Sequence, residues 1–175
     1  TVNPVNDAPV LAEIGDLNFN EGGGSSVELN ATDIESDALS YSVSGGTNVS
    51  ASVSTNGNTF LDLVSGSDFN GSEMITITVC DNDFDDELCE SEDVTVTVDS
   101  VNDAPMITST AGIVARTSEE YSYQATVEDA DDSEFIYSLS NNPALMEVSG
   151  TGLVTWSPST GTFTSGAVVL TATDD

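Results

Sequence analysis

The sequence predicts an all-β protein built from two tandem β-sandwiches, and two observations lead to this prediction. Short runs in which apolar and polar residues alternate recur along the whole chain. The signature VNDAPV at residues 5–10 returns as VNDAPM at residues 101–106, 96 positions later. One β-sandwich needs roughly 100 residues. The repeat therefore predicts one sandwich over residues 1–100 and a second over residues 101–175.

Seven strands are expected in the first module, because β-branched and polar residues alternate there with a period of two. That period places one face of a strand on a core and the other in water. Clusters of Asn, Gly and Ser, such as residues 44–46 and 55–58, separate the runs as hairpin turns require. The expected strands are residues 10–14, 27–29, 39–43, 49–53, 60–64, 75–79 and 94–98.

The second module repeats this scheme with six expected strands: residues 106–109, 121–127, 135–139, 146–149, 153–157 and 168–172. Aligning residues 77–81 with residues 170–174 shows that the chain stops where module one still has about twenty residues to go. The second sandwich is therefore expected to lack its last strand. We expect an unpaired sheet edge there, which a neighbouring chain fills or which lowers the stability of the module.

The charge of the chain excludes several classes of function. It has 31 Asp and Glu residues against one basic residue, Arg116, and no His, for a formal net charge of −30. Binding to a nucleic-acid backbone depends on Lys and Arg, and an acidic chain is repelled from an anionic membrane surface. Without His there is no Ser-His-Asp nucleophile and no imidazole zinc site. A non-catalytic protein without nucleic-acid partners or membrane insertion is expected, although chemistry that uses carboxylates alone stays open.

Acidic residues follow equivalent strands in both modules. Asp33 and Glu35 come after the second expected strand of module one, and Asp129 and Asp131 occupy the corresponding positions in module two. In an extended loop, residues two apart point the same way, so each pair offers carboxylate oxygens to one ion. Oxygen ligands without nitrogen or sulfur favour Ca²⁺.

Two other interpretations of the acidic residues stay open. A solvated acidic turn would have the same composition as a metal site. Residues 81–87, with Glu92 at the twelfth place, imitate an EF-hand loop. However, Asp86 stands where that loop needs Gly, and strands are expected where an EF-hand has helices.

Cys80 and Cys89 are the two cysteines of the chain, and they bracket the connection between the last two expected strands of module one. On adjacent antiparallel strands a disulfide across the base of this hairpin is geometrically easy. It would close an acidic loop and would indicate an exported protein, whereas two free thiols are the alternative.

These motifs resemble the cadherin-like tandem repeats of large bacterial surface proteins. The resemblance rests on the paired VNDAP signatures, the acidic pairs after the strands, and the Thr-Val-Thr-Val run at residues 95–98. Module two is more similar to the dystroglycan-type cadherin-like domain, through residues 107–109, 121–123, 129–131, 137–139 and 151–158. The resemblance implies Ig/cadherin-like Greek-key sandwiches joined end to end, with Ca²⁺ at the junction.

The resemblance also implies which side chains would hold calcium. The linker would supply Asn102 and Asp103, the near end of module two Asp129, Asp131 and Asp174, and the far end of module one Glu21 and Asp68. A second copy of the site, at the free end of module one, would consist of Asn6, Asp7, Asp33, Glu35 and Asp81.

The expected function is that of a calcium-stiffened spacer or adhesion unit in a bacterial surface or secreted protein. The chain opens within a repeat unit, which is typical of a segment of a longer exported protein. Expected partners are calcium, homophilic protein contacts or an extracellular polysaccharide. The alternative is a carbohydrate-binding accessory module of a secreted polysaccharide-degrading enzyme. Trp156, the one tryptophan, could serve such a module, but an isolated aromatic residue in an apolar strand favours core packing.

Overall fold

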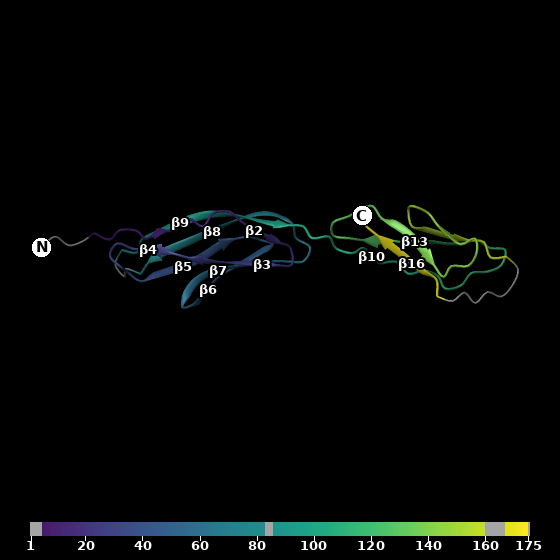
Figure 1. Cartoon of the computed structure of the whole chain (residues 1–175), viewed down its shortest axis with the longest axis horizontal. Helices are drawn as coiled ribbons and strands as arrows, with labels where there is room; N and C mark the ends of the chain where they lie inside the picture. Colours follow the sequence, from purple (N-terminus) through teal and green to yellow (C-terminus); the bar gives the residue numbers. More distant parts are fainter. Residues whose placement is uncertain (1–4, 83–85, 160–166, 175) are drawn as a thin grey trace. The chain divides into compact units, whose positions relative to one another are not determined.

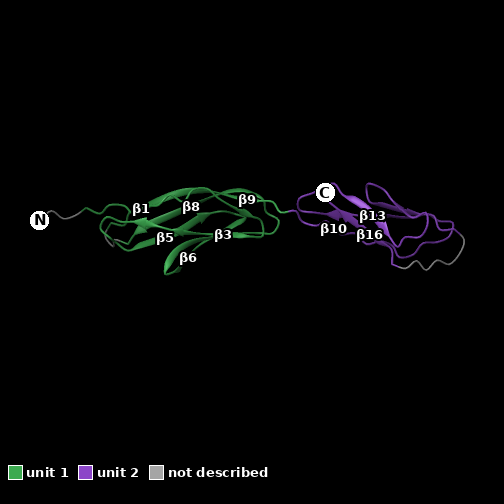
Figure 2. Ribbon diagram, viewed as in Figure 1, with its two compact units in different colours: residues 1–101 green, residues 102–175 purple. Residues whose placement is uncertain are grey.

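The computed structural model describes residues 5–82, 86–159 and 167–174, and over these residues it is all-β, as predicted. The chain separates into two compact units, unit 1 (Thr1–Val101) and unit 2 (Asn102–Asp175) (Figure 2). No membrane-crossing helix is present in the part of the chain that is described.

Unit 1 consists of two larger sheets and a two-stranded one. The four-stranded sheet has the order β2 (Leu17–Asn20), β9 (Cys89–Asp99), β8 (Gly71–Asp81) and β5 (Leu39–Gly45). The three-stranded sheet has the order β3 (Gly24–Leu29), β7 (Asn58–Ser65) and β6 (Val49–Asn56), while β1 (Val10–Leu11) pairs with β4 (Ala31–Thr32). The strands run along the length of the unit (Figure 1). Only the β2–β9 pair is parallel among these pairings.

The core of unit 1 follows from the alternation seen in the sequence. In β8, every second residue from Ile75 to Val79 is fully buried, and the residues between them are partly exposed. Of these, Ile75 and Ile77 belong to one core cluster with Leu61 and Leu63 of the opposite sheet, which makes the unit a sandwich. Fully burying one such side chain contributes about 1.5 to 3 kcal/mol, so alternation over two long strands is enough to hold the sheets together.

Two strand predictions in unit 1 need correction. β2 was not expected, because it has four residues and pairs with the distant β9 in parallel, so neither alternation nor hairpin spacing reveals it. The strand expected at residues 10–14 ends at Leu11. Beyond Leu11, the carboxylate of Glu92 accepts a hydrogen bond from the backbone N–H of Ile14 (N···Oε1 3.1 Å). At this point a side-chain hydrogen bond takes the place of backbone pairing between strands.

Unit 2 has three small sheets. They are β10 (Met106–Ile107) with β12 (Val127–Glu128); β11 (Tyr121–Gln124), β15 (Leu153–Trp156) and β14 (Glu147–Val148); and β13 (Ile136–Ser140) with β16 (Val169–Thr173). Met146, Val154 and Trp156 form the buried centre of its core, as expected for the tryptophan. Within the described residues, β16 pairs with β13 alone.

Candidate functional site

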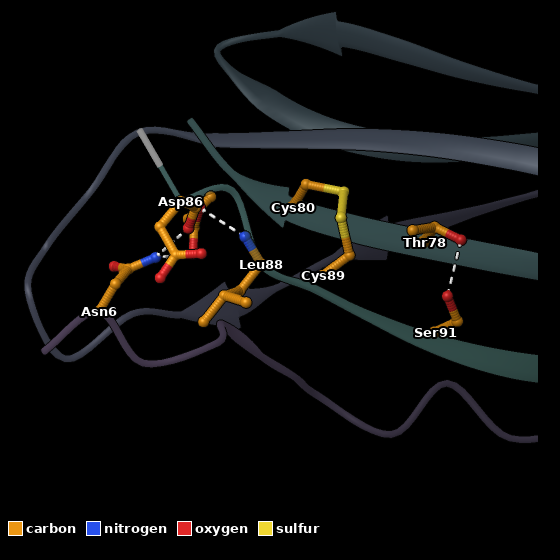
Figure 3. The surroundings of a disulfide bond; sticks show 8 residues. Asn6, Thr78, Cys80, Asp86, Leu88, Cys89 and Ser91 are labelled. Carbon is orange, nitrogen blue, oxygen red and sulfur yellow. Dashed lines mark hydrogen bonds between the residues drawn. A yellow bond between two sulfur atoms is a disulfide. The ribbon is translucent and has the colours of Figure 1, made fainter. Parts of the chain in front are cut away.

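The five residues predicted to bind calcium at the free end of unit 1 lie together in the structure. Asn6 and Asp7 precede β1, and Asp81 is the last residue of β8. The side-chain amide of Asn6 donates to Asp81 (Nδ2···Oδ2 3.0 Å) and to the carbonyl of Asp86 (2.8 Å). Figure 3 shows Asn6 reaching toward Asp86 and Leu88 at the end of the β8–β9 hairpin. The signature is thereby tied to the far end of a strand 75 residues away in sequence.

Asp33 and Glu35 belong to the same cluster. Asp33 Oδ1 accepts the backbone N–H groups of Glu35 (2.9 Å) and Asp37 (3.0 Å), which closes the loop after β4 on itself, as Asp side chains do in turns. The backbone N–H of Asp7 donates to Glu35 Oε2 (3.4 Å). The five residues predicted at this end of unit 1 are therefore linked in two hydrogen-bonded groups, Asn6 with Asp81 and Asp7 with Asp33 and Glu35.

Unit 2 has a similar arrangement at the corresponding residues. The amide of Asn102 donates to Asp174 (Nδ2···Oδ2 3.0 Å), and the backbone N–H of Asp103 donates to Asp131 Oδ2 (2.9 Å). Asp129 Oδ1 accepts the N–H groups of Asp131 and Asp132, both at 2.8 Å. Three of these four bonds fall on corresponding residues of the two units, whereas the second bond to the Asp comes from Asp37 in unit 1 and from Asp132 in unit 2. The shared bonds therefore belong to the repeat and not to one loop.

Each cluster contains a buried carboxylate oxygen that the hydrogen bonds leave unused. Asp33 Oδ2 and Asp129 Oδ2 are buried and have no hydrogen-bond partner within the described residues, and Asn6 Oδ1 is in the same state. An unsatisfied buried polar atom costs about 1 to 3 kcal/mol, and more when it is charged. A cation that binds these oxygens would remove that cost, and the donors are all hard oxygen atoms of the kind that Ca²⁺ accepts.

The carboxylates do not form a ready-made cage. No group of three or more Cys, Asp and Glu side chains within holding distance of one metal ion is found in the described residues. The hydrogen bonds explain this, because Asp33, Glu35 and their counterparts in unit 2 turn oxygens toward backbone N–H groups. The donors are hard oxygen atoms of the kind that Ca²⁺ accepts, and an ion would have to draw the carboxylates inward to be held by several of them.

Asp81 is fully buried, which is unusual for a carboxylate. Its Oδ2 accepts the hydrogen bond from the Asn6 amide, and its Oδ1 accepts the backbone N–H of Leu88 at 3.0 Å. Burying a charge is costly unless it is hydrogen-bonded or paired. Its position at the end of β8, with both oxygens engaged, makes Asp81 the structural anchor of the cluster in unit 1.

Glu21 and Asp68, the residues predicted at the other end of unit 1, differ in their surroundings. Glu21 is 8% exposed; its Oε1 accepts the backbone N–H of Val101 (2.5 Å), and its Oε2 is buried without a hydrogen-bond partner among the described residues. Asp68 is exposed and accepts the hydroxyl of Ser67. A backbone bond from Gly22 to Gly66 (2.8 Å) joins the two loops, but within the described part no hydrogen bond joins Glu21 to Asp68.

The predicted disulfide between Cys80 and Cys89 is present, with Cα atoms 4.1 Å apart at the end of the β8–β9 ladder (Figure 3). The neighbouring EF-hand interpretation falls partly on residues 83–85, which lie outside the described residues. Strands flank that loop, and the carboxylate of Glu92 is bonded to the backbone of Ile14. Both features disfavour an EF-hand.

Sequence reasoning missed one strongly held carboxylate, that of Glu73. It accepts N–H groups from Thr47 (2.8 Å), Asn48 (backbone 3.0 Å, side chain 2.7 Å) and Val49 (3.0 Å) in the β5–β6 turn. Burial raises the pKa of this group, but the four N–H donors outweigh burial and lower the pKa to about 2. No local motif reveals this contact, because the carboxylate and its donors lie about 25 residues apart in sequence.

Comparison with solved structures supports the architecture. Drosophila N-cadherin EC1-4 aligns with a TM-score of 0.57 and 14% identity, over 95% of this chain and 45% of that chain. An endo-fucoidan hydrolase from glycoside hydrolase family 107 aligns with a TM-score of 0.44 and 17% identity, over 91% of this chain and 25% of that chain. The chain thus spans less than half the length of either protein. Identities this low show a shared fold and nothing of function, and the hydrolase alignment is too loose to support even that.

The comparison with curated proteins finds no match. A protein-family model described as Bacterial Ig domain matches residues 6–99, which is more than half of the 175 residues and contains every strand of unit 1. The match confirms the Ig/cadherin-like class expected from the sequence. The chain, with its sandwich closed by β8 and β9, belongs to the bacterial Ig domain family.

Proposed function

We propose that the two units are calcium-binding extracellular modules that act as a stiffened spacer or adhesion unit of a bacterial surface or secreted protein. The observation that supports this proposal most directly is the pair of buried, unpartnered oxygens, Asp33 Oδ2 and Asp129 Oδ2, at corresponding positions of two hydrogen-bonded clusters. In a solvated acidic turn, the carboxylate oxygens would be exposed to water and not buried.

In unit 1 the ion would bind beside Asp33, with Asp7, Glu35, Asp81 and the carbonyl oxygen of the Asn6 amide as the other donors. In unit 2 the corresponding residues are Asn102, Asp103, Asp129, Asp131 and Asp174. Glu21 and Asp68 are further candidate donors at the other end of unit 1. Bound Ca²⁺ would supply two positive charges to side chains that otherwise repel one another in a chain of net charge −30.

The mechanical consequence follows from where the signature residues lie. Asn6 and Asp7, like Asn102 and Asp103, stand at the start of their unit, before its first strand. An ion shared by the signature and by residues after later strands would fix the chain at the entrance of each unit. Extracellular sites of this kind bind at about 0.1 to 1 mM. One site at ten times its dissociation constant would add about 1.4 kcal/mol of stability.

The finer assignment is part of the same proposal. We assign the repeat to the VNDAP-type cadherin-like class, and unit 2 to its dystroglycan-type branch. The disulfide favours an oxidising compartment, which agrees with an exported protein. The modules would be non-catalytic, with homophilic protein contacts or an extracellular polysaccharide as partners besides calcium.

The test compares thermal unfolding in millimolar Ca²⁺ and in chelator. Binding to both clusters should raise both melting temperatures, that of unit 2 being followed by Trp156 fluorescence. Asp33→Asn should remove the response of unit 1 and leave that of unit 2, and Asp129→Asn should do the reverse. Asn keeps an oxygen for the loop hydrogen bonds but lowers the charge offered to the ion.

Glu13→Gln is the matched control, because Glu13 is an exposed acid that follows β1 outside both clusters. It should leave both calcium responses unchanged. Equal melting temperatures in Ca²⁺ and chelator for the original chain would contradict the proposal, as would equal losses in all three variants.

A further inference from the structure

Three Asn residues of unit 1 stand in the triplet Asn-X-Ser/Thr, in which the Asn side chain is the acceptor of N-linked glycans in secreted proteins. They are Asn30, Asn48 and Asn70. Such triplets arise by chance in a chain rich in Asn, Ser and Thr, so the sequence alone does not tell an acceptor from a coincidence. The surroundings of the three side-chain amides in the structure do tell them apart.

The amide nitrogen of Asn48 is held by a carboxylate. It donates to Glu73 (Nδ2···Oε1 2.7 Å), and the backbone N–H of Asn48 donates to the same oxygen (3.0 Å). A hydrogen bond to an ionised carboxylate is stronger than one between neutral groups. The nitrogen that would have to bond to a sugar is therefore engaged, and Asn48 is a poor acceptor.

The other two amides are free to react. Asn30 directly follows β3, Asn70 directly precedes β8, and both residues are exposed. Within the described residues, no hydrogen bond engages the side-chain amide of either. A glycan is bulky and needs such a surface position.

The chain around Asn30 presents three polar groups on one face. Leu29 is 3% exposed and belongs to the core of unit 1, whereas Glu28, Asn30 and Thr32 are exposed. Residues two apart in an extended segment point the same way. The amide, the hydroxyl that completes the triplet and a carboxylate two positions before the amide are therefore accessible together.

The chain around Asn70 has the same pattern. Phe69 packs against the core of unit 1, whereas Asp68, Asn70 and Ser72 are exposed. Both accessible triplets thus have an acidic residue two positions before the Asn. The triplet of Asn48 has Gly46 at that position.

We propose that Asn30 and Asn70 are acceptor sites for N-linked glycans, and that a cationic group of the transferase binds the acidic residue two positions before each. The donor would be a glycan carried on a lipid diphosphate. The amide nitrogen attacks the anomeric carbon of the glycan, and a C–N bond forms as the C–O bond to the diphosphate breaks. The lipid diphosphate leaves, and the nitrogen gives up one proton to a base of the transferase. Neither site depends on calcium binding.

The test incubates the folded chain with a bacterial oligosaccharyltransferase and a glycan on a polyprenyl diphosphate. The masses of the intact chain and of its proteolytic peptides should show two added glycans, on Asn30 and Asn70. Asn48 should be modified more slowly by roughly tenfold or more, because its amide must first leave a carboxylate. Asn30→Gln and Asn70→Gln should each remove one glycan.

Charge variants test the recognition of the acidic residue. Glu28→Gln should slow the modification of Asn30 by roughly tenfold and leave that of Asn70 unchanged, since one charge-assisted hydrogen bond to the transferase is lost. Gln keeps an oxygen for the bond that Glu28 accepts from the Asn58 amide (2.6 Å). Asp68→Asn should do the reverse, so each site is the internal control of the other.

Glu13→Gln, which removes an exposed acid outside both triplets, should leave both rates unchanged. Melting temperatures of all variants would show that none of them loses its fold. The proposal is overturned if neither Asn30 nor Asn70 receives a glycan, or if Asn48 is modified as quickly as they are. It is equally overturned if both charge variants are modified at the original rates.

Discussion

Unit 1 and unit 2 have the same acidic cluster on sheets that differ in completeness. In unit 1 the cluster stands at the end of a four-stranded sheet, and ten buried apolar residues form the core. In the described part of unit 2 the equivalent sheet has two strands, and three buried apolar residues form the core. Three hydrogen bonds of the cluster nonetheless occur at corresponding residues of both units: the amide bond of Asn6 or Asn102, the backbone bond of Asp7 or Asp103, and the first backbone bond to Asp33 or Asp129.

This difference shows that the cluster depends on local segments more than on the whole sheet. Its parts are the signature, the turn after β4 or β12, and the end of β8 or β16. All three are present in both units, whereas β9 has no counterpart in the described part of unit 2. The calcium binding proposed for the clusters and the stability of each unit should therefore be separable by mutation.

The largest contrast is expected from a matched pair of core truncations. Ile77→Ala should lower the free energy of unfolding of unit 1 by about 3 kcal/mol, because Ile77 is fully buried and leaves a cavity. Its counterpart Leu170 is half-buried and lines an open groove of about 850 Å³ beside Met146 and Trp156, so Leu170→Ala should cost unit 2 only about 1 kcal/mol. Urea unfolding would follow unit 1 by hydrogen exchange in β8 and unit 2 by Trp156 fluorescence. Equal costs would mean that the groove is closed in solution.

The second contrast concerns the disulfide. Replacing both cysteines, Cys80→Ser with Cys89→Ser, should destabilise unit 1 by about 2 to 3 kcal/mol, because the unfolded chain loses a crosslink around a short loop. Unit 2 has Thr173 at the position of Cys80 and no crosslink there. Its transition, followed by Trp156, should keep the same midpoint. A shift of both transitions by the same amount would show that the units unfold together.

The strands of five or more residues could be predicted from the sequence because apolar and polar residues alternate along them. The runs at residues 75–79 and 94–98 alternate strictly, and they became the centres of β8 and β9. β2 could not be predicted, since four residues of mixed character gain a strand conformation only by pairing with β9. Whether such a segment forms a strand depends more on its pairing with a neighbouring strand than on its own β-strand propensity.

The candidate site was predictable for a different reason. Asp33 and Asp129 stand at equivalent positions of the repeat, and aligning the two copies of the repeat requires no knowledge of the structure. The sequence could not indicate the hydrogen-bond partner of each carboxylate oxygen. For example, Asp33 Oδ1 accepts hydrogen bonds from two backbone N–H groups, while Asp33 Oδ2 is buried. Those choices depend on the loop conformation after β4, where Ser36 has a positive φ of 70°.

The smallest expected effect belongs to Glu73, which acts in unit 1 alone. Glu73→Gln should lower the stability of unit 1 by about 1 kcal/mol at pH 7, because the amide group of Gln would face N–H donors; screening by water limits the loss. The folded-state pKa of Glu73 is about 2, below its ordinary value of 4.5. A lowered pKa means that the ionised carboxylate stabilises the folded state above pH 4.5.

That contribution should therefore disappear as the pH falls from about 4.5 to about 2, where Glu73 becomes protonated in the folded protein as well. Urea unfolding of the original chain and of Glu73→Gln across this range should give two curves that converge at the acidic end. Unit 2, followed by Trp156, should show no difference between the two proteins at any pH. A gap between the unit 1 curves that persists below pH 2 would mean that Gln disturbs the β5–β6 turn by its shape and not by its missing charge.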